Sequence, residues 1–437
     1  MGVKKQSDIK DMLWVAIPKG IGGLSQLLLS LVLIRFMGPS PFGIVSVCLS
    51  CVLLLDSVFG SAIDMAIFRL APLYRESQPL RSRQIEQAGL LLKPVVCLLL
   101  LGPLTILLPA LSRLLFQDPS HGLALLMAFG ALLGLLMFRS MQVHFQIEHR
   151  FAAYGVADMT HTAVRYTALG ILLALGLATP VSILGCYLAS AFLVTAIGLY
   201  AWTRPVLAAP FNRSTVGELG SVLKWYLPTV VVGSIASRMD VFFVSSLAGV
   251  GEAGIYGVAQ MFALVPQLMG TYAAAVYSPR ILPMWRAGGL TKTYFRVQTL
   301  LVAISAAVCL LTWTAIGPLG SRLLPADYQR AKDVILWLVP SGLAAMINFP
   351  LTIPLLLYTH SRLLLAADMV CIALAAFVYY LAVPGHGAAV AAAVTSGIAF
   401  LRLIFYQGVA VRLLRRDPEG AHWSGTAEAN QYAGAPA

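Results

Sequence analysis

The sequence predicts an all-α polytopic membrane protein with about twelve transmembrane helices in two six-helix halves. Three observations predict this class: an apolar composition, a series of long apolar spans and an internal repeat. Of the 437 residues, 59% are hydrophobic and only 11% are charged, whereas a soluble domain has about 25% charged residues. A chain of this composition cannot cover a globule with polar side chains, so it must lie in lipid.

The apolar spans supply the helix count. A helix needs about 20 apolar residues to cross the hydrocarbon core, and the spans are far longer than barrel strands and lack their alternation. The sequence contains twelve such spans, centred near residues 25, 53, 99, 132, 167, 191, 234, 266, 306, 345, 372 and 399.

Two stretches of the sequence repeat each other at an offset of 211 residues. The first, MLWVAIPKGIGGLSQLLLSLVLIRFMGPSPFGIVSV, begins at position 12, and the second, LKWYLPTVVVGSIASRMDVFFVSSLAGVGEAGIYGV, begins at position 223. The aligned pairs include Trp14 with Trp225, Gly38 with Gly249, and Gly43 with Gly254. Parallel repeats of this kind are common among transporters. We therefore expect a first bundle over 1–203, a cytoplasmic linker over 204–220, a second bundle over 221–415 and a disordered cytoplasmic tail over 416–437.

The repeat also decides the meaning of GVGEAG at positions 249–254. These letters match a dinucleotide fingerprint, but that fingerprint needs a strand before it and a soluble βαβ unit around it. Here an apolar span precedes and follows it, and the first-half counterpart GPSPFG lacks the first G-x-G. The pattern predicts a tight turn between two helices. We expect no nucleotide, cofactor or metal, and no catalytic residues.

The basic residues predict the orientation in the membrane. Most of the 30 Lys and Arg fall at the termini and in alternate loops, such as Arg69, Arg75, Arg280 and Arg286, and near the C-terminus. Only five fall in the other loops: Arg35, Arg113, Arg322, Arg330 and Lys332. Cytoplasmic loops carry the excess of positive charge, so both termini are expected in the cytoplasm. This asymmetry explains the net charge of +12 without a nucleic-acid partner.

Polar residues inside the spans are the candidate site residues, because a charge near mid-bilayer costs at least about 2.5–3.5 kcal/mol and normally faces a wet cavity or a partner. Two spans carry them at helical spacing: Lys19, Gly23, Gln26 and Ser30 in the first, and Tyr154, Asp158, His161 and Arg165 in the fifth. We assign a substrate cavity to Lys19, Gln26, Arg165, Arg238 and Arg402, and ion coupling to Asp56, Asp158, His161 and Asp240.

Each of these assignments has a structural alternative. Lys19 can extend back to the interface, as long cationic side chains near helix ends do. His161 can be a hydrogen-bonded structural histidine, and Asp64 can pair with nearby arginines. Asp158 and Arg165 are two turns apart, too far for a close pair on one helix, and Arg238 and Asp240 face nearly opposite sides. Each of these charges therefore needs a partner on another helix or a ligand.

Three stretches together resemble a known family: QLLLSLVLIRFMGPSPFGIVSV, FGSAIDMAIFRLAPLYRE at 59–76, and RMDVFFVSSLAGVGEAGIYGVAQ with YSPRILP within 238–283. The chain resembles the polysaccharide transport family of the multidrug/oligosaccharidyl-lipid/polysaccharide exporter superfamily, over nearly its whole length to about residue 415. In the family pattern the matching positions are Arg69, Gly254, Tyr256 and Pro279, which look like loop and helix-end residues.

The resemblance implies two six-helix bundles that form a V around a central cavity and work by alternating access. It implies a flippase of the cell inner membrane that moves undecaprenyl-pyrophosphate-linked repeat units of O-antigen lipopolysaccharide, capsule or exopolysaccharide. The implied partners are this lipid-linked oligosaccharide, membrane lipids, and a polysaccharide polymerase with its chain-length regulator. A cavity rich in cations suits a pyrophosphate, since arginine binds such oxygens bidentately.

Two rival functions remain from the sequence. A drug/cation antiporter of the same superfamily would be expected to rely more on buried carboxylates. A membrane sugar polymerase or ligase would be expected to carry a large external loop with catalytic residues. The external loops predicted here are short, which argues against an enzyme.

Overall fold

The computed structural model describes residues 2–75, 77–202, 204–277, 281–286 and 288–416. All twelve predicted span centres lie in helices. The long helices of the first half are α1 (Gly2–Phe36), α2 (Pro39–Asp56) continued by the π-helical turn η1 (Ser57–Ser61) and α3 (Ala62–Tyr74), α4 (Pro79–Ile106), α6 (Gly122–Ile147), α7 (Phe151–Ala174) and α8 (Pro180–Trp202). Shorter elements are α5 (Leu108–Phe116), η2 (Pro119–His121) and α9 (Arg204–Leu207).

The second half repeats this order. Its helices are α10 (Arg213–Ala248), α11 (Val250–Tyr277), α12 (Ile281–Arg286), α13 (Leu290–Leu323), η4 (Ala326–Tyr328), α14 (Ala331–Asn348), α15 (Thr352–Thr359) and α16 (Ser361–Arg416). No strand occurs among the described residues, so the predicted all-α class is confirmed. Because α10 begins at Arg213, the last part of the predicted linker 204–220 is helical.

Helix α16 contains two of the predicted spans and bends sharply between them. Gly387 has φ 68° and ψ −150° inside this 56-residue element, a backbone region that essentially only glycine adopts. Immediately after the bend, the backbone N–H of Ala388 donates to Oε2 of Glu252 at 2.9 Å. Glu252 also pairs with Arg330 at 2.6 Å. Glu252, in the first turn of α11, therefore holds the start of the last span in place.

We predict that Gly387→Ala destabilises the protein. An alanine Cβ would lie 2.6 Å from Oε2 of Glu252, and the backbone conformation itself costs a non-glycine residue about 1–3 kcal/mol. The expected result is a lower melting temperature in detergent. Gly385→Ala is the matched control, because no atom lies within 4 Å of its added Cβ. Equal melting temperatures for the two variants would contradict this account of the bend.

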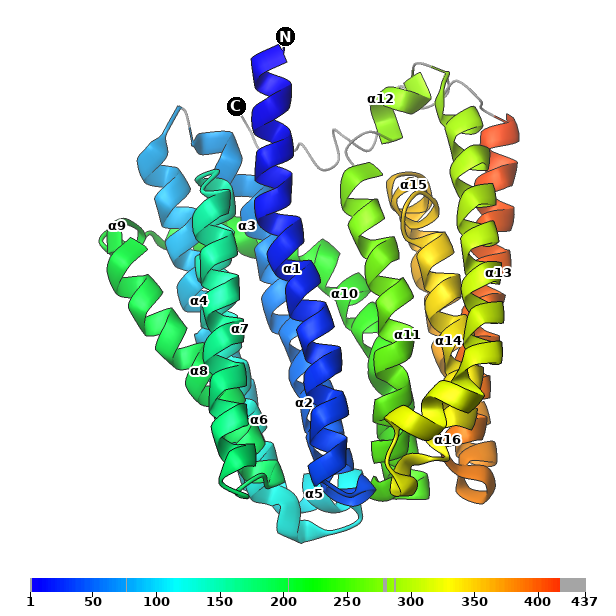
Figure 1. Cartoon of the computed structure of the whole chain (residues 1–437). Helices are drawn as coiled ribbons and strands as arrows, with labels where there is room; N and C mark the ends of the chain where they lie inside the picture. The colour runs from blue at the N-terminus through cyan, green and yellow to red at the C-terminus, as the bar shows by residue number, and fades with distance from the viewer. Residues whose placement is uncertain (1, 76, 203, 278–280, 287, 417–437) are drawn as a thin grey trace.

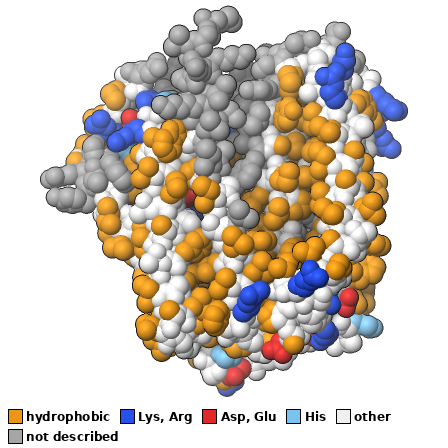
Figure 2. Space-filling model, viewed as in Figure 1, with side chains coloured by type: hydrophobic (Ala, Val, Ile, Leu, Met, Phe, Trp, Pro, Cys, Tyr) orange, Lys and Arg blue, Asp and Glu red, His pale blue; other side chains and the backbone are white. Residues whose placement is uncertain are grey.

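The outer surface of the helices is apolar, as expected for a protein in lipid. Figure 2 shows hydrophobic side chains spread over the helices, with charged side chains gathered toward the two ends. Helix α13 is an example, with Leu310, Leu311 and Trp313 all exposed. Seven of the described helical segments are long and apolar enough to cross a membrane by length and composition alone. Helix α7 is not among them because Asp158 and Arg165 interrupt its apolar run.

The two halves form two lobes that lie side by side in Figure 1. In the first lobe α6 packs against α8 and α1 against α7, and in the second α11 and α16 pack against α14. We call the end where α1 begins and α16 finishes the terminal end. The opposite end, where α1 turns into α2 and α10 into α11, is called the loop end.

The lobes meet at the loop end through a symmetric seam between α2 and α11. A Cβ added at Gly43 would overlap the carbonyl oxygen of Val250, and a Cβ added at Gly254 would overlap that of Pro39. These four residues are two pairs related by the 211-residue offset, 39 with 250 and 43 with 254. Helix backbones can approach this closely only where the side chain is a hydrogen. The seam therefore has the symmetry that the repeat requires.

Further contacts join the lobes at both ends. At the loop end, Tyr328 donates from its hydroxyl to the carbonyl of Met37 at 3.0 Å, and Ser245 donates to the carbonyl of Leu115 at 2.5 Å. At the terminal end, the first turns of α10 pack on α3 and α4, where Leu219 is fully buried. Helix α10 thus follows the first lobe along much of its length.

Candidate functional site

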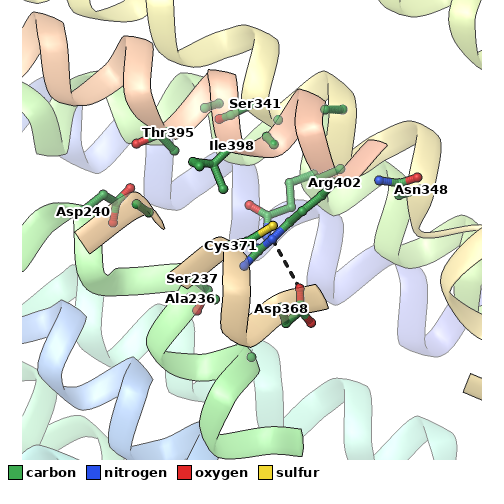
Figure 3. Close-up of a pocket in the computed structure, with 18 of the residues that line it drawn as sticks. Ala236, Ser237, Asp240, Ser341, Asn348, Asp368, Cys371, Thr395, Ile398 and Arg402 are labelled. Carbon is green, nitrogen blue, oxygen red and sulfur yellow. Dashed lines mark ion pairs between the residues drawn. The ribbon is translucent and has the colours of Figure 1, made fainter. Parts of the chain in front are cut away.

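A cavity of about 400 Å³ lies inside the second lobe. Its walls come from α10, α11, α14 and α16, with Phe349 and Ile353 beside them. Two of the residues that the sequence analysis assigned to a site, Asp240 and Arg402, line this cavity. Figure 3 shows Asp240 near Thr395 and Arg402 at a separate part of the wall, beside Asp368. The volume is typical of a small-molecule site.

Arg402 has an acidic partner that the sequence analysis missed. Its Nε lies 3.2 Å from Oδ1 of Asp368, and the hydroxyl of Tyr406 donates to the same oxygen at 2.6 Å. All three residues belong to α16, but Asp368 precedes the Gly387 bend and Arg402 follows it. The bend therefore brings the two charges together across adjacent spans. The spacing of residues within one span cannot predict an ion pair between two spans.

Asp240 is fully hydrogen-bonded at its own part of the cavity wall. Its Oδ2 accepts from the hydroxyl of Tyr256 at 2.7 Å, and its Oδ1 accepts from the backbone N–H of Val241 at 2.8 Å. The Tyr256 hydroxyl also contacts Thr395 at 2.9 Å, and Thr395 contacts Tyr379 at 2.7 Å. Tyr256, which the family pattern suggested to be a helix-end residue, is completely buried and positions this carboxylate.

A second group of predicted residues meets in the first lobe. The Arg165 guanidinium lies 4.9 Å from the ring centre of Tyr166 and 4.8 Å from that of Tyr187. Gln26 on α1 donates to the Tyr187 hydroxyl at 3.2 Å and accepts from the Tyr166 hydroxyl at 3.4 Å. We call Gln26, Arg165, Tyr166 and Tyr187 the arginine–tyrosine cluster. Within the described residues, Arg165 has no acidic partner, and its Nε is buried without a hydrogen bond.

The other members of the fifth-span ladder face the interior of the first lobe. Asp158 accepts from Gln142 of α6 at 2.9 Å, which is the cross-helix partner that its position required. His161 is buried, packs on the Phe138 ring at 4.6 Å and lies 3.5 Å from Ser190. These contacts are those of a structural histidine.

The acids of the second span are paired with cations. Asp56 lies 2.8 Å from Nη2 of Arg139, and Asp64 accepts from Nζ of Lys93. The expectation that Asp64 pairs with an arginine was therefore wrong, because the lysine on the neighbouring α4 occupies that place. Lys93 and Arg139 are two intramembrane cations that the sequence analysis did not single out.

Arg238 joins neither the cavity nor the arginine–tyrosine cluster. Arg238 makes no hydrogen bond or ion pair in the described part of the chain and does not line the cavity, although its neighbours Ser237 and Met239 do. The side chain of Lys19 and the whole of Pro279 lie outside the described residues.

Two lobes of long apolar helices with charged residues inside each lobe define a polytopic α-helical membrane protein. The profile of the family described as "Polysaccharide biosynthesis protein" matches residues 9–285. The chain belongs to this family. A search of curated protein sequences finds no match.

Solved structures of transporters share the fold. The lipid II flippase MurJ, in an inward closed conformation, superposes with a TM-score of 0.74 at 12% identity, covering 91% of this chain and 87% of that one. An inward-facing multidrug resistance MATE family transporter of the MOP superfamily has a TM-score of 0.64 at 14% identity, covering 93% and 99%. A MOP superfamily transporter from Pyrococcus furiosus, described as having a binding pocket of reverse polarity, has a TM-score of 0.51 at 14% identity, covering 92% and 96%.

Proposed function

We propose that the protein is a flippase that moves oligosaccharide repeat units on undecaprenyl pyrophosphate across the bacterial cytoplasmic membrane. The observation that carries this proposal is the arginine–tyrosine cluster. Arg165 is half-buried, donates from Nη2 to the Tyr166 hydroxyl at 3.3 Å, and has no acid beside it among the described residues. Such a guanidinium can bind the oxygens of an anionic headgroup. Membership of the polysaccharide biosynthesis family gives the headgroup its most natural identity, a pyrophosphate that carries a sugar.

The charges of the two lobes also bear on the rival function, transport of a drug cation. An antiporter of cations needs carboxylates that are free to bind them. Asp56, Asp64 and Asp368 are each paired with a cation. Asp158 and Asp240 have no ion pair but accept hydrogen bonds from Gln142 and Tyr256. Membership of the polysaccharide biosynthesis family therefore carries the preference for the flippase. The second rival, a sugar polymerase or ligase, lacks support because the described loop-end connections are short.

The proposed transport cycle uses the two lobes as rigid bodies. The terminal end faces the cytoplasm by the distribution of basic residues, so the seam of Gly43 and Gly254 closes the external side. The sugar-pyrophosphate head enters from the cytoplasm, binds the half-buried Arg165, and leaves when the seam opens, while the lipid tail stays in the bilayer. The closed seam of this structure represents the state that receives substrate.

We predict the following labelling with an impermeant thiol reagent in intact cells. Cysteines at the exposed positions Asp118 and Asp327, both at the loop end, should react because that end faces outward. Cysteines at the exposed positions Arg83 and Lys292, at the terminal end, should react only after the cells are opened. The reverse pattern would contradict the proposed orientation.

The function itself is tested by deleting the gene and analysing lipid extracts by mass spectrometry. A lipid-linked oligosaccharide should accumulate, and its mass should identify the sugar unit. Expression of the wild-type chain should remove it. An unchanged lipid profile, together with increased sensitivity to cationic drugs, would replace the flippase by the antiporter.

A further inference from the structure

A ladder of ionisable side chains, all buried except Arg139, crosses half of the first lobe and plays no part in the arginine–tyrosine cluster. Its first rung is Glu86 with His144, where the His144 Nδ1 lies 2.6 Å from Oε2 of Glu86. The second rung is Asp64 with Lys93, and the third is Asp56 with Arg139. The rungs lie on α2–η1–α3, α4 and α6, three packed elements of one lobe.

The rungs lie at successive depths. Glu86 and Lys93 are two turns apart on α4, which separates them by about 10 Å along the axis. Glu86 lies two turns from the start of α4 at the terminal end, whereas Asp56 lies near the middle of the 36-residue span Pro39–Tyr74. The ladder therefore leads from the terminal end to mid-membrane. Chains of acids and histidines at such depths are typical of proton relays.

Two carboxylate oxygens of the ladder lack any hydrogen-bond partner, although both are buried. They are Oε1 of Glu86 and Oδ1 of Asp56. Glu86 is 5% exposed and Asp56 is 1% exposed. An unsatisfied buried acceptor is costly unless water or a proton occupies it. The two oxygens stand at the two ends of the ladder, so each end has one open position.

A small cavity lies beside Glu86. Its volume is about 10 Å³, and Glu86, Ser140 and His144 contribute to its wall. This space is close to that of one water molecule. A metal ion is a poor occupant, because no group of three or more potential metal ligands occurs among the described residues. A water molecule in this space could pass a proton to Glu86.

We propose that Glu86 and Asp56 are two proton-binding groups of the first lobe. Glu86 takes a proton from the water-sized cavity, and Asp56 takes one at its open Oδ1 near mid-membrane. At each site one O–H bond of a hydrated proton breaks and one carboxyl O–H bond forms, so no further reactant is needed. The charged groups around these two sites are Asp56, Asp64, Glu86, Lys93, Arg139 and His144, with the pairs Arg75–Glu148 and Arg81–Glu218 nearer the terminal end.

The arrival of a proton at Asp56 has a structural consequence. A neutral Asp56 no longer attracts Arg139 as an ion, and the Arg139 side chain is already 38% exposed. Asp56 also directly precedes the π-helical turn η1, a feature that often marks functional sites in helices. The side chain of Asp56 fills the space beside Gly60 of that turn. Protonation of Asp56 therefore weakens the contact between α2 and α6. This contact lies next to η1, where the π-helical turn is wider than an α-helix.

One part of this inference rests on the proposed function: that the proton drives the return of the lobes in the flipping cycle. The site itself is tested without any lipid-linked substrate. Infrared difference spectra of the purified full-length protein, recorded between alkaline and acidic buffer, report protonated carboxyl groups directly. A poorly hydrated carboxyl absorbs at a higher wavenumber than a hydrated one, so a buried group is separated from surface acids.

Acidification should produce a high-wavenumber carboxyl band that is reduced in Glu86→Gln and in Asp56→Asn. Glu148→Gln is the matched control, because Glu148 is a partly exposed acid of the same lobe, and this change should leave the band intact. Melting temperatures show which variants are folded, and either acid variant alone suffices if the other does not fold. No band in the wild type, or a band unchanged in a folded acid variant, would overturn the proposal.

The outcomes also separate this proposal from the flippase itself. A protein that removes accumulated lipid-linked oligosaccharide but shows no such band has the proposed function without the proton site. A protein that shows the band, loses it in Glu86→Gln, and moves no lipid-linked oligosaccharide has the proton site and a different substrate.

Discussion

Arg165→Ala is expected to stop the flipping of lipid-linked oligosaccharide while the protein remains folded in the membrane. In the described structure Arg165 has no acidic partner, so its removal strands no opposite charge. What the alanine loses is contact with the rings of Tyr166 and Tyr187, and cation–π contacts of this kind are worth about 0.5–2 kcal/mol. Accumulation of the lipid-linked intermediate in a complemented deletion strain measures the loss of flipping, and membrane levels measure folding.

Arg165→Lys distinguishes charge from geometry. Lysine keeps the positive charge but loses the planar fork that holds two phosphate oxygens at once, so we expect partial flipping. Arg35→Ala is a suitable control, because Arg35 is an exposed arginine at the loop end, and it should flip normally. Wild-type flipping by a stable Arg165→Ala protein would remove Arg165 from the substrate path. Disappearance of the variant from the membrane would instead assign Arg165 to packing.

Among the proposed variants, Gly254→Ala and Gly43→Ala are expected to destabilise the closed state most. The added methyl group would overlap a backbone carbonyl of the other lobe, and a backbone atom in a helix cannot move aside as a side chain can. Overpacking of this kind typically costs about 1–3 kcal/mol. Both variants should therefore show lower melting temperatures and greatly reduced flipping, since the external side no longer closes.

Gly251→Ala is the control for the seam, because it lies in the same turn. The nearest atom to its added Cβ is the flexible Ser40 hydroxyl at 3.3 Å, so its melting temperature should stay close to that of the wild type. If Gly251→Ala were as damaging as Gly254→Ala, the glycines would act through the turn rather than through contact between the lobes. The symmetric seam would then have no role in the cycle.

The fold could be predicted from the sequence because lipid imposes a simple rule. An apolar run of sufficient length must be a helix, so composition and spacing alone located the spans, and the 211-residue offset related the halves. The close approach of Gly43 to Gly254 lay beyond that reasoning. The alignment paired these glycines as equivalents, but equivalence in a repeat does not say that the two positions touch. The contact depends on how the two lobes pack against each other, and a local sequence pattern cannot predict that packing.

The site was only partly predictable for a related reason. Helical spacing places residues on one face of their own helix, and it named Gln26 and Arg165, which both contact Tyr166 and Tyr187. It does not identify the neighbouring helix. Lys93 and Asp368 therefore escaped notice, since each stands singly in an apolar run and finds its partner on another span or beyond a bend. For Asp56, the sequence indicated a buried acid but not the arginine that neutralises it.

The most direct test of the central claim is transport by the purified protein in proteoliposomes. The vesicles would contain the lipid-linked oligosaccharide recovered from the deletion strain, and a membrane-impermeant enzyme that acts on the sugar would report how much reaches the outer leaflet. The flippase account predicts faster appearance in the outer leaflet with wild-type protein than with protein-free vesicles, and no such increase with Arg165→Ala. Equal rates with and without wild-type protein, together with transport of a small organic cation by the same vesicles, would contradict it.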